Sequence, residues 1–332
     1  MSNPLRIGTL GTAGIVARAL LRPGKDVPEV AVVSVGSRTL EKAQAYASTH
    51  GIPKACLYED VIADPEIDVV YIALPNSMHA EWSIRALRAG KHVLCEKPMT
   101  SNTAEALEVA RVVAQGTGVY MEAFHFPFHP FAKRVRDILD TRAIGAILSA
   151  DAQFQIPSRA FQPGNIRFNF ALAGGAMMDA GCYIVQALRG ILGESRQVME
   201  AVATPDQADP RVDTGMRAIV EFAGGSRATL HASFLAAEKA AVDITLRGEA
   251  GKLTISSLYV PQWGGSLRLE AGRRVYTESA DPTPSYVYQL RELVRCVRDG
   301  APVLTSAANG VANMKLIDAI YSKAGLPLRG QA

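Results

Sequence analysis

A lysine directly follows a short apolar run in the segment Cys95-Glu96-Lys97-Pro98. The preceding residues His92-Val93-Leu94 predict a strand, and open α/β sheets bind ligands at the carboxyl ends of their strands. Lys97 would then be directed toward a ligand. Taken alone, a lysine at a strand end is more often a solvated charge. Its candidacy as a catalytic residue therefore depends on the groups that the rest of the chain supplies.

A carboxylate and a phenol occur at positions i and i+4 in the segment Gly174-Gly175-Ala176-Met177-Met178-Asp179-Ala180-Gly181-Cys182-Tyr183. In a helix, Asp179 and Tyr183 would share one face. Each also has a structural explanation, because an aspartate near a helix start suits the helix dipole and a tyrosine is often half-buried core. Beside a lysine, however, a tyrosine becomes a proton donor, since the ammonium favours phenolate and lowers the pKa from about 10. We therefore predict Lys97, Tyr183 and Asp179 as the catalytic residues.

The first strand pattern, at residues 5–10, leads into a glycine-containing turn. Glycines there allow a tight turn, let backbone amides approach a pyrophosphate and leave that phosphate at a helix start. Ala13 and Val16 stand at the second and third glycine positions of G-x-G-x-x-G, so a plain strand-to-helix turn is the alternative. The βαβ context favours dinucleotide binding by Gly11, Thr12, Ala13, Gly14 and Ile15.

The end of the second strand pattern, Val35-Gly36-Ser37-Arg38, offers a hydroxyl and a guanidinium but no acid. NAD-binding proteins use an acid there to accept a hydrogen bond from the ribose 2′-hydroxyl. A guanidinium instead suits the 2′-phosphate of NADP, to which it donates a bidentate pair. Ser37 and Arg38 therefore predict NADP in preference to NAD. In the alternative, Arg38 is a solvated helix-start residue and NAD binds without an acid.

Further cofactor-binding candidates are Leu74, Pro75, Asn76, His79, Glu96, Lys97 and Arg167. The first four end the next strand and could meet the nicotinamide half, although Asn76 and His79 could equally be structural residues of a helix start. Arg167 precedes the glycine pair and could reach a ligand or pair with an acid. Glu122, His125 and His129 stand among phenylalanines, which favours aromatic packing, and we predict no metal site.

The composition is that of a soluble globular protein with small ligands. The chain has 332 residues, enough for two domains, and a formal charge of +3 without long runs of one sign. It gives no reason to expect nucleic acid or a membrane as partner. The four cysteines form no C-x-x-C pair, and neither a signal sequence nor an apolar run of about 18 residues is evident. We therefore expect a cytoplasmic protein.

The pattern of elements predicts an α/β fold in two domains. Up to residue 124, strands are expected at 5–10, 30–35, 69–74, 92–95 and 119–123, and helices at 14–21, 40–50, 79–89 and 103–115. Later residues predict helices and strand hairpins, one of them with a two-residue turn at Gly224-Gly225. We expect a Rossmann dinucleotide-binding domain at residues 1–124. Residues 125–332 should form an α/β domain with an open, mainly antiparallel sheet for substrate binding and oligomerisation.

The chain resembles the glucose-fructose oxidoreductase, inositol dehydrogenase and MocA family over nearly its whole length. The likeness rests on Gly11-x-x-Gly14-Ile15, Ser37-Arg38, Leu74-Pro75-Asn76-x-x-His79, Ala89-Gly90-Lys91-His92-Val93-Leu94-Cys95-Glu96-Lys97-Pro98 and Gly174-Gly175-Ala176-x-x-Asp179-x-Gly181-x-Tyr183. Within the family, dimeric dihydrodiol dehydrogenases and NADP-linked D-xylose dehydrogenases have a tyrosine at the position of Tyr183. The resemblance implies a pyridine dinucleotide, a catalytic Lys97, a cis Lys97-Pro98 peptide and a homo-oligomer formed through the C-terminal sheet.

The sequence therefore predicts an NADP-dependent oxidoreductase acting on a CH–OH group. It would move a hydride between nicotinamide and a carbinol, hemiacetal or carbonyl carbon of a sugar-like substrate of the D-xylose or trans-dihydrodiol type. One alternative is a keto-sugar reductase of a biosynthetic pathway. Another is a non-catalytic dinucleotide-binding sensor or repressor, which the presence of both Lys97 and Tyr183 disfavours.

Overall fold

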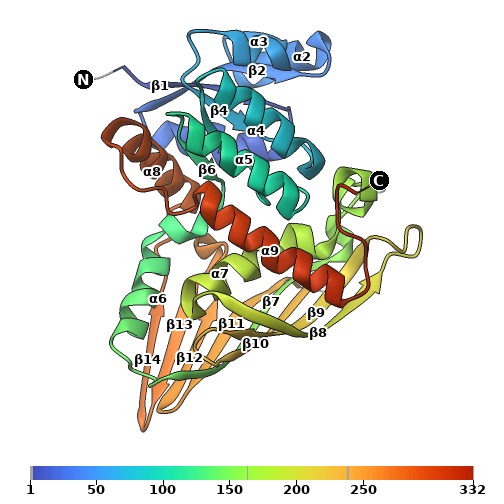
Figure 1. Ribbon diagram of the computed structural model, residues 1–332. Coiled ribbons are helices and arrows are strands. Elements are labelled where there is room, and N and C mark those ends of the chain that lie inside the picture. Colours follow the sequence, from blue (N-terminus) through green and yellow to red (C-terminus); the bar gives the residue numbers. More distant parts are fainter. Residues whose placement is uncertain (1–2, 163, 238, 332) are drawn as a thin grey trace. The chain divides into compact units, whose positions relative to one another are not determined.

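The computed structural model describes residues 3–162, 164–237 and 239–331 (Figure 1). These residues group into two compact units. The first runs up to His125 and adds Tyr286–Val311, and the second consists of Phe126–Ser285 and the residues from Ala312 on. The chain thus leaves the first unit and later returns to it. A domain border at residue 124 stays a prediction. Tyr286–Val311 lie after that border in the sequence but pack with the residues before it.

The first unit is built on a sheet of parallel strands in the order β3-β2-β1-β4-β5-β6. Its strands are β1 (Leu5–Leu10), β2 (Val30–Ser37), β3 (Lys54–Leu57), β4 (Val69–Ile72), β5 (His92–Cys95) and β6 (Tyr120–Glu122). All residues of β4 are buried, as expected of a strand covered on both faces. This order confirms the predicted Rossmann sheet, whose direction of winding switches between β1 and β4 at the ligand-binding edge.

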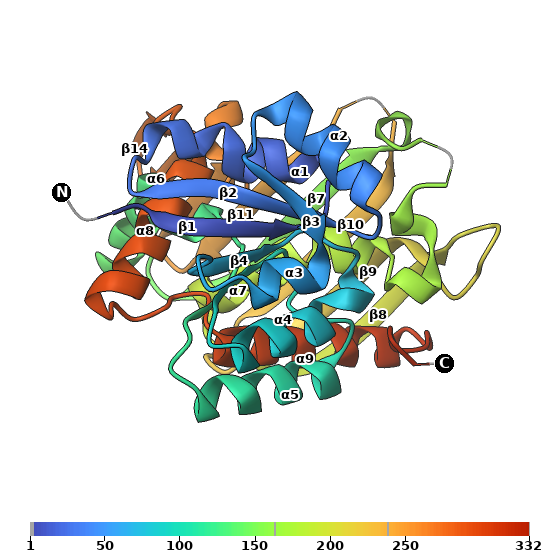
Figure 2. The same ribbon diagram turned by 90° about the horizontal axis from the view of Figure 1, so that it is seen from above.

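Helices cover both faces of the first sheet, with α1 and α2 on one face and α3, α4 and α5 on the other (Figure 2). The helices are α1 (Gly14–Val16), which continues into a π turn at Ala17–Leu21, α2 (Leu40–His50), α3 (Tyr58–Ala63), α4 (His79–Arg88), α5 (Thr103–Gln115) and α8 (Ser285–Asp299). Asn102 caps α5 by accepting a hydrogen bond from the backbone N–H of Glu105 (3.0 Å). The sequence prediction missed β3 and α3.

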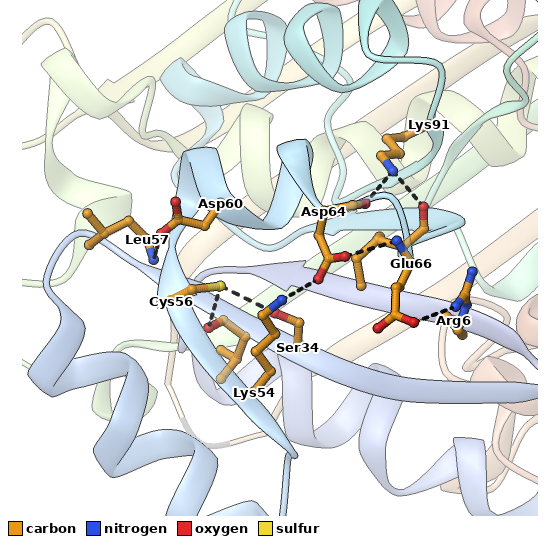
Figure 3. A network of polar contacts seen from close by, with 11 residues as sticks. Arg6, Ser34, Lys54, Cys56, Leu57, Asp60, Asp64, Glu66 and Lys91 are labelled. Atoms are coloured by element: carbon orange, nitrogen blue, oxygen red, sulfur yellow. Dashed lines mark hydrogen bonds and ion pairs between the residues drawn. The ribbon is translucent and has the colours of Figure 1, made fainter.

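A polar network joins residues near the amino ends of β4 and β5 (Figure 3). Lys91, which precedes β5 and is only 8% exposed, donates from Nζ to the carbonyl oxygens of Asp64 (2.6 Å) and Ile67 (2.8 Å). The Asp64 carboxylate accepts a hydrogen bond from Lys54 (2.7 Å), and this bond holds the pKa of Asp64 below its usual value. The network fixes the turn between α3 and β4 against the start of β5.

The second unit contains an open sheet in the order β14-β13-β12-β11-β7-β10-β9-β8 (Figure 1). Its strands are β7 (Ile147–Pro157), β8 (Ser195–Pro205), β9 (Asp213–Phe222), β10 (Arg227–Ala236), β11 (Ala241–Gly248), β12 (Gly251–Ser256), β13 (Ser266–Ala271) and β14 (Arg274–Ser279). Neighbouring strands are antiparallel except for the parallel pair β7 and β10. The predicted open, mainly antiparallel sheet is confirmed.

The turn between β9 and β10 differs from the two-residue turn that the sequence suggested. The backbone N–H of Phe222 donates to the carbonyl oxygen of Ser226 (2.9 Å), so the loop holds the three residues Ala223, Gly224 and Gly225. Gly225 takes the left-handed conformation with φ +82°. A three-residue hairpin loop with glycine at this position keeps the right-handed twist of the flanking strands.

The helices of the second unit include a long apolar stretch. They are α6 (Pro130–Asp140), a π turn at Met177–Gly181 followed by α7 (Cys182–Leu192), and most of α9 (Ala307–Lys323). Among the described residues, the helical stretch Phe170–Leu192, which contains Asp179 and Arg189, is by length and composition alone apolar enough to cross a membrane. However, 83% of its most apolar window is buried inside the fold, and α7 packs on β7 and β10. It has the character of a core helix.

Candidate active site

The turn after β1 can be made only by glycine at its first position. Gly11 has φ +104°, and a Cβ atom there would lie 2.5 Å from the carbonyl oxygen of Ala73. A Cβ atom on Gly14 would meet nothing within 4 Å. Thr12, Ala13, Gly14 and Ile15 occupy exposed or half-buried positions at the helix start, where the first backbone N–H groups lack intrahelical partners. The turn therefore fits the diphosphate of a dinucleotide.

The end of β2 presents a guanidinium and no acid. Ser37 is 4% exposed, whereas Arg38 is exposed. Thr39, not Arg38, caps α2 by accepting a hydrogen bond from the backbone N–H of Lys42 (3.4 Å). Burial raises the pKa of Tyr58, and the nearby Arg38 guanidinium opposes this rise. A hollow of about 380 Å³ beside the glycine turn is lined by Thr12, Lys42, Ala45, Tyr46 and Thr49.

His79 joins the loops that follow β4 and β5. Its side chain is fully buried, with Nδ1 2.8 Å from the carbonyl oxygen of Pro98 and Nε2 2.9 Å from that of Leu74. Burial lowers the pKa of His79, the two carbonyl groups oppose this, and the charge of Lys97 lowers it further. Both ring nitrogens thus face protein carbonyls. Contact of His79 with a cofactor stays a prediction.

Asn76 does not cap α4, which is the structural role considered for it from the sequence. It belongs to a single 3₁₀ turn, Asn76–Met78, whose N-cap is Pro75. The N-cap of α4 is Met78, and neither cap residue makes a side-chain cap hydrogen bond. Pro75 and Asn76 are both half-buried, so their candidacy for cofactor contact is untouched.

Lys97 lies between two anchored neighbours at the carboxyl end of β5. The Glu96 carboxylate accepts a hydrogen bond from the buried Tyr71 hydroxyl (2.6 Å). The backbone N–H of Met99 donates to Glu122 Oε1 (2.7 Å), and Glu122 is 1% exposed. The Lys97-Pro98 peptide is cis, as the family resemblance implied. The half-buried Lys97 is thus carried by a loop that is fixed on both sides.

Arg167 pairs with Asp179 in the second unit. Arg167 Nε lies 2.6 Å from Asp179 Oδ2, and the two side chains are 37% and 16% exposed. Of the two roles that the sequence left open for Arg167, pairing with an acid is the one observed. Asp179 lies in the π turn Met177–Gly181 rather than in an α-helix, which corrects the assumed helical spacing. Such turns are frequent at functional sites.

Tyr183 lies in the first turn of α7 and is 9% exposed. Its ring centroid lies 5.5 Å from that of Phe154, 5.8 Å from that of Tyr259 and 6.1 Å from that of Phe126. These contacts fix the plane of the ring, as a positioned phenol requires. Lys97 belongs to the first unit and Tyr183 to the second, so their joint action belongs to the proposal below.

The residues considered as metal ligands have structural partners. The backbone N–H of Phe131 donates to His129 Nδ1 (3.0 Å), which caps α6, and the His125 ring packs against Tyr286 with the ring centroids 4.0 Å apart and the planes tilted by 39°. Glu122 anchors Met99. Within residues 3–162, 164–237 and 239–331, no group of three or more His, Cys, Asp or Glu side chains could hold a metal ion.

Comparison with known proteins adds independent findings. A family model described as "Oxidoreductase family, NAD-binding Rossmann fold" matches residues 5–124, and the GFO/IDH/MocA C-terminal domain matches residues 132–254. The chain is 34% identical to D-xylose 1-dehydrogenase (NADP(+)) 2 of Haloferax volcanii over 96% of this chain and 97% of that protein. It is also 34% identical to trans-1,2-dihydrobenzene-1,2-diol dehydrogenase of Xenopus laevis, over 62% of each. A solved 3-ketoreductase from Actinomadura kijaniata, in complex with NADP and TDP-benzene, superposes with a TM-score of 0.87 at 28% identity, covering 97% of this chain and 98% of that one.

Proposed function

Because the chain belongs to the GFO/IDH/MocA family of oxidoreductases, we propose that it moves a hydride between NADP(H) and a carbon of a sugar-like substrate. The reacting carbon is a carbinol or hemiacetal carbon, as in D-xylose or a trans-dihydrodiol. The observation that carries the proposal is the placement of Lys97 at the carboxyl end of β5, on a loop anchored at Glu96 and Met99.

The residues fit NADP better than NAD. The space beside Gly14 at the helix start suits a diphosphate, and the exposed Arg38 suits a 2′-phosphate where an acid would suit a free ribose. When bound, the cofactor supplies the hydride acceptor or donor at nicotinamide C4. We assign cofactor contact to the candidates Gly11, Thr12, Ala13, Gly14, Ile15, Ser37, Arg38, Leu74, Pro75, Asn76, Glu96, Lys97 and Arg167. The remaining candidate, His79, would act indirectly by holding these loops, because its buried ring already faces two protein carbonyl groups. The NADP-linked relative and the NADP-bound neighbour support NADP as the cofactor.

The chain's own chemistry is proton transfer at the substrate oxygen. In oxidation, Tyr183 accepts the hydroxyl proton as the C–H bond gives up its hydride, and in reduction it returns that proton. Lys97 binds the same oxygen and stabilises the phenolate. Asp179, held by Arg167 at 2.6 Å, accepts a hydrogen bond from a neighbouring substrate hydroxyl. A site that bonds several hydroxyl groups discriminates strongly against analogues that lack them.

A second candidate is reduction of a keto-sugar by the same residues. It is favoured by the likeness to the 3-ketoreductase from Actinomadura kijaniata, which covers 97% of this chain. In this direction Tyr183 acts as the general acid toward a carbonyl oxygen. The two candidates differ in substrate and direction, not in site.

The decisive test is a substrate screen followed by nucleotide absorbance at 340 nm. Sugars and diols with NADP and with NAD test oxidation, while keto-sugars with the reduced cofactors test reduction. We expect turnover with NADP(H) and an aldose or diol. Turnover of keto-sugars alone would select the second candidate, and binding of nucleotide without any turnover would contradict both.

A cytoplasmic location and self-association through the second sheet are also part of the proposal. The four cysteines are buried and form no disulfide within the described residues, which suits a reducing compartment. The edge strand β14 exposes Val275 and Tyr276 (54% and 45%), so a second copy could cover apolar side chains there. Sedimentation of the purified protein would measure the oligomeric state.

A further inference from the structure

A buried ion pair contacts Gly174-Gly175, the glycine pair that precedes the π turn at Met177–Gly181. Arg329 Nη2 lies 2.6 Å from Asp213 Oδ1, and both side chains are 0% exposed. Arg329 also donates from Nε to the carbonyl oxygen of Gly174 (2.6 Å). Its guanidinium carbon lies 4.2 Å from the centroid of the Tyr321 ring. We call Asp213, Tyr321 and Arg329 the latch.

Side chains of the latch form hydrogen bonds with the backbone at Gly174 and, after the glycine pair, at Met177. Asp213 Oδ2 accepts a hydrogen bond from the backbone N–H of Met177 (2.7 Å), where the π turn begins. Asp213 Oδ1 accepts hydrogen bonds from the Tyr321 hydroxyl (2.8 Å) and from Arg329. The carbonyl of Gly174 and the N–H of Met177 are therefore both held by side chains of one cluster.

The glycine pair is required by the closeness of its neighbours. Gly175 has φ +135°, and a Cβ atom there would lie 2.2 Å from Asp213 Oδ1 and 2.8 Å from the Tyr321 hydroxyl. A Cβ atom on Gly174 would lie 2.5 Å from the carbonyl oxygen of Arg167. The turn is thus packed between the latch on one side and the backbone that carries Arg167 on the other.

A buried ion pair is weak evidence for stability, because the loss of hydration can exceed the attraction between the charges. Its best-attested use is to select one arrangement among several. Here, the arrangement that the latch selects is the start of the π turn. Asp179 lies within that turn and Tyr183 one turn later, in α7.

We propose that Asp213, Tyr321 and Arg329 are positioning residues for Asp179 and Tyr183. They fix the backbone from Gly174 to Met177, so that Asp179 faces Arg167 and the Tyr183 phenol takes its reactive position. The inference rests on the proposed function, in which these two side chains meet the substrate. A displacement of about 1 Å in a catalytic group can cost on the order of 10²-fold in rate.

Two variants disturb the latch from opposite sides. Gly175→Ala places a methyl group against the Asp213 carboxylate, and Tyr321→Phe removes the hydroxyl that donates to Asp213 while keeping the ring. Gly225→Ala is the matched control, because Gly225 also has a positive φ (+82°) but no atom lies within 4 Å of its Cβ position. This control shows what a side chain at a positive φ costs in the second unit when it meets no neighbouring atom.

The first measurement is steady-state kinetics of the full chain with the substrate found in the screen. We expect kcat to fall about 10–100-fold in Gly175→Ala and about 3–10-fold in Tyr321→Phe. The apparent pKa of the Tyr183 limb should shift in both, with Kd for NADP unchanged. The double variant should be little worse than Gly175→Ala, since both changes act on one cluster. Variants that unfold earlier but keep the kcat and pH profile of the unmodified enzyme would overturn the proposal.

The second measurement does not need activity. Amide hydrogen exchange should rise in the peptide covering residues 174–183 of both latch variants and stay unchanged there in Gly225→Ala. If the screen finds no substrate, raised exchange confined to this peptide still supports the latch, while the proposed function alone fails. Exchange that rises evenly throughout the second unit would contradict a positioning role.

Discussion

Two lysines flank the same strand, one before it and one after it, and they differ in burial and in proposed role. Lys91 precedes β5 and is 8% exposed. Its ammonium group donates hydrogen bonds to the carbonyl oxygens of Asp64 and Ile67. Lys97 follows β5, is half-buried and lies on a loop anchored through its neighbours. At the amino end of the strand, the lysine is bonded to backbone carbonyl groups of the same chain (Figure 3). Both ends of β5 are held by hydrogen bonds, but at the amino end the lysine itself is one of the donors that these bonds use, whereas at the carboxyl end neighbours of the lysine form them.

The largest expected effect belongs to the carboxyl end. Lys97→Met should lower kcat by roughly 10²–10⁴-fold, because it removes the charge that stabilises the phenolate. Its free energy of unfolding should change little, since the side chain is only half-buried. Steady-state kinetics and urea unfolding measure both. Near-full activity of Lys97→Met on a verified substrate would contradict the catalytic role proposed for Lys97 and its contrast with Lys91.

Tyr183→Phe tests the partner of Lys97 by pH dependence. The oxidation rate should rise with pH through an apparent pKa below about 10, because Tyr183 must lose its proton to act as a base. Tyr183→Phe should lower kcat by roughly 10²–10⁴-fold and abolish that limb while NADP binding is retained. A limb that persists in Tyr183→Phe would assign the titration to another group.

The matched change at the amino end of β5 is Lys91→Met. It should lower the free energy of unfolding and leave kcat unchanged. It leaves the carbonyl groups of Asp64 and Ile67 without their donor, which should cost about 2–5 kcal/mol of unfolding free energy. At a temperature where the variant is folded, kcat should equal that of the unmodified enzyme. A loss of kcat in the folded variant would remove the distinction between the two ends.

Arg38→Ala tests the cofactor preference at the end of β2. Loss of a charged hydrogen-bonding group should weaken NADP binding by about 1.5–3 kcal/mol and leave NAD binding nearly unchanged. Arg88→Ala, at an exposed position at the end of α4, is the control for loss of a positive charge. Titration of both nucleotides decides the matter, and an equal loss for NADP and NAD would sink the assignment.

The smallest effect concerns His79, whose ring contacts the carbonyl oxygens of Leu74 and Pro98 after the carboxyl ends of β4 and β5. Its pKa is lowered in the fold, so between the folded value and about 6.5 the unfolded state binds more protons. Unfolding free energy should therefore fall on acidification below about pH 6.5, by at most about 1.4 kcal/mol per pH unit for this group. Urea unfolding at several pH values should show a shallower slope for His79→Gln. The exposed His50 provides the control His50→Gln, and equal slopes in both variants would contradict the assignment.

The elements that carry local signals were predictable from the sequence. β1, β5, α2 and α5 begin and end where hydrophobic pattern, caps and glycines indicated. β3 and α3 were missed because Lys54–Leu57 is short and begins with a charge. The edge strand β14 was missed because Arg274–Ser279 is largely exposed and has no buried face to impose alternation.

The candidate site divides in the same way. Lys97, Asp179 and Tyr183 stand in local motifs, so the sequence could nominate them. Asp213 and Arg329 carry no local motif and become recognisable only when the fold places them 2.6 Å apart. The glycine pair was the one available signal, since it marks a close approach without naming the neighbour.

The return of the chain to the first unit sets an order on its completion during synthesis. The backbone N–H of Glu122 donates to the carbonyl oxygen of Thr305 (2.9 Å), and a Cβ atom on Gly310 would lie 2.4 Å from Met99 Sδ. Residues that support the Lys97 loop thus leave the ribosome only after the whole of Phe126–Ser285. Contacts of such long sequence separation form slowly. The Rossmann unit is begun first, but it cannot be finished until the intervening residues Phe126–Ser285 have been made.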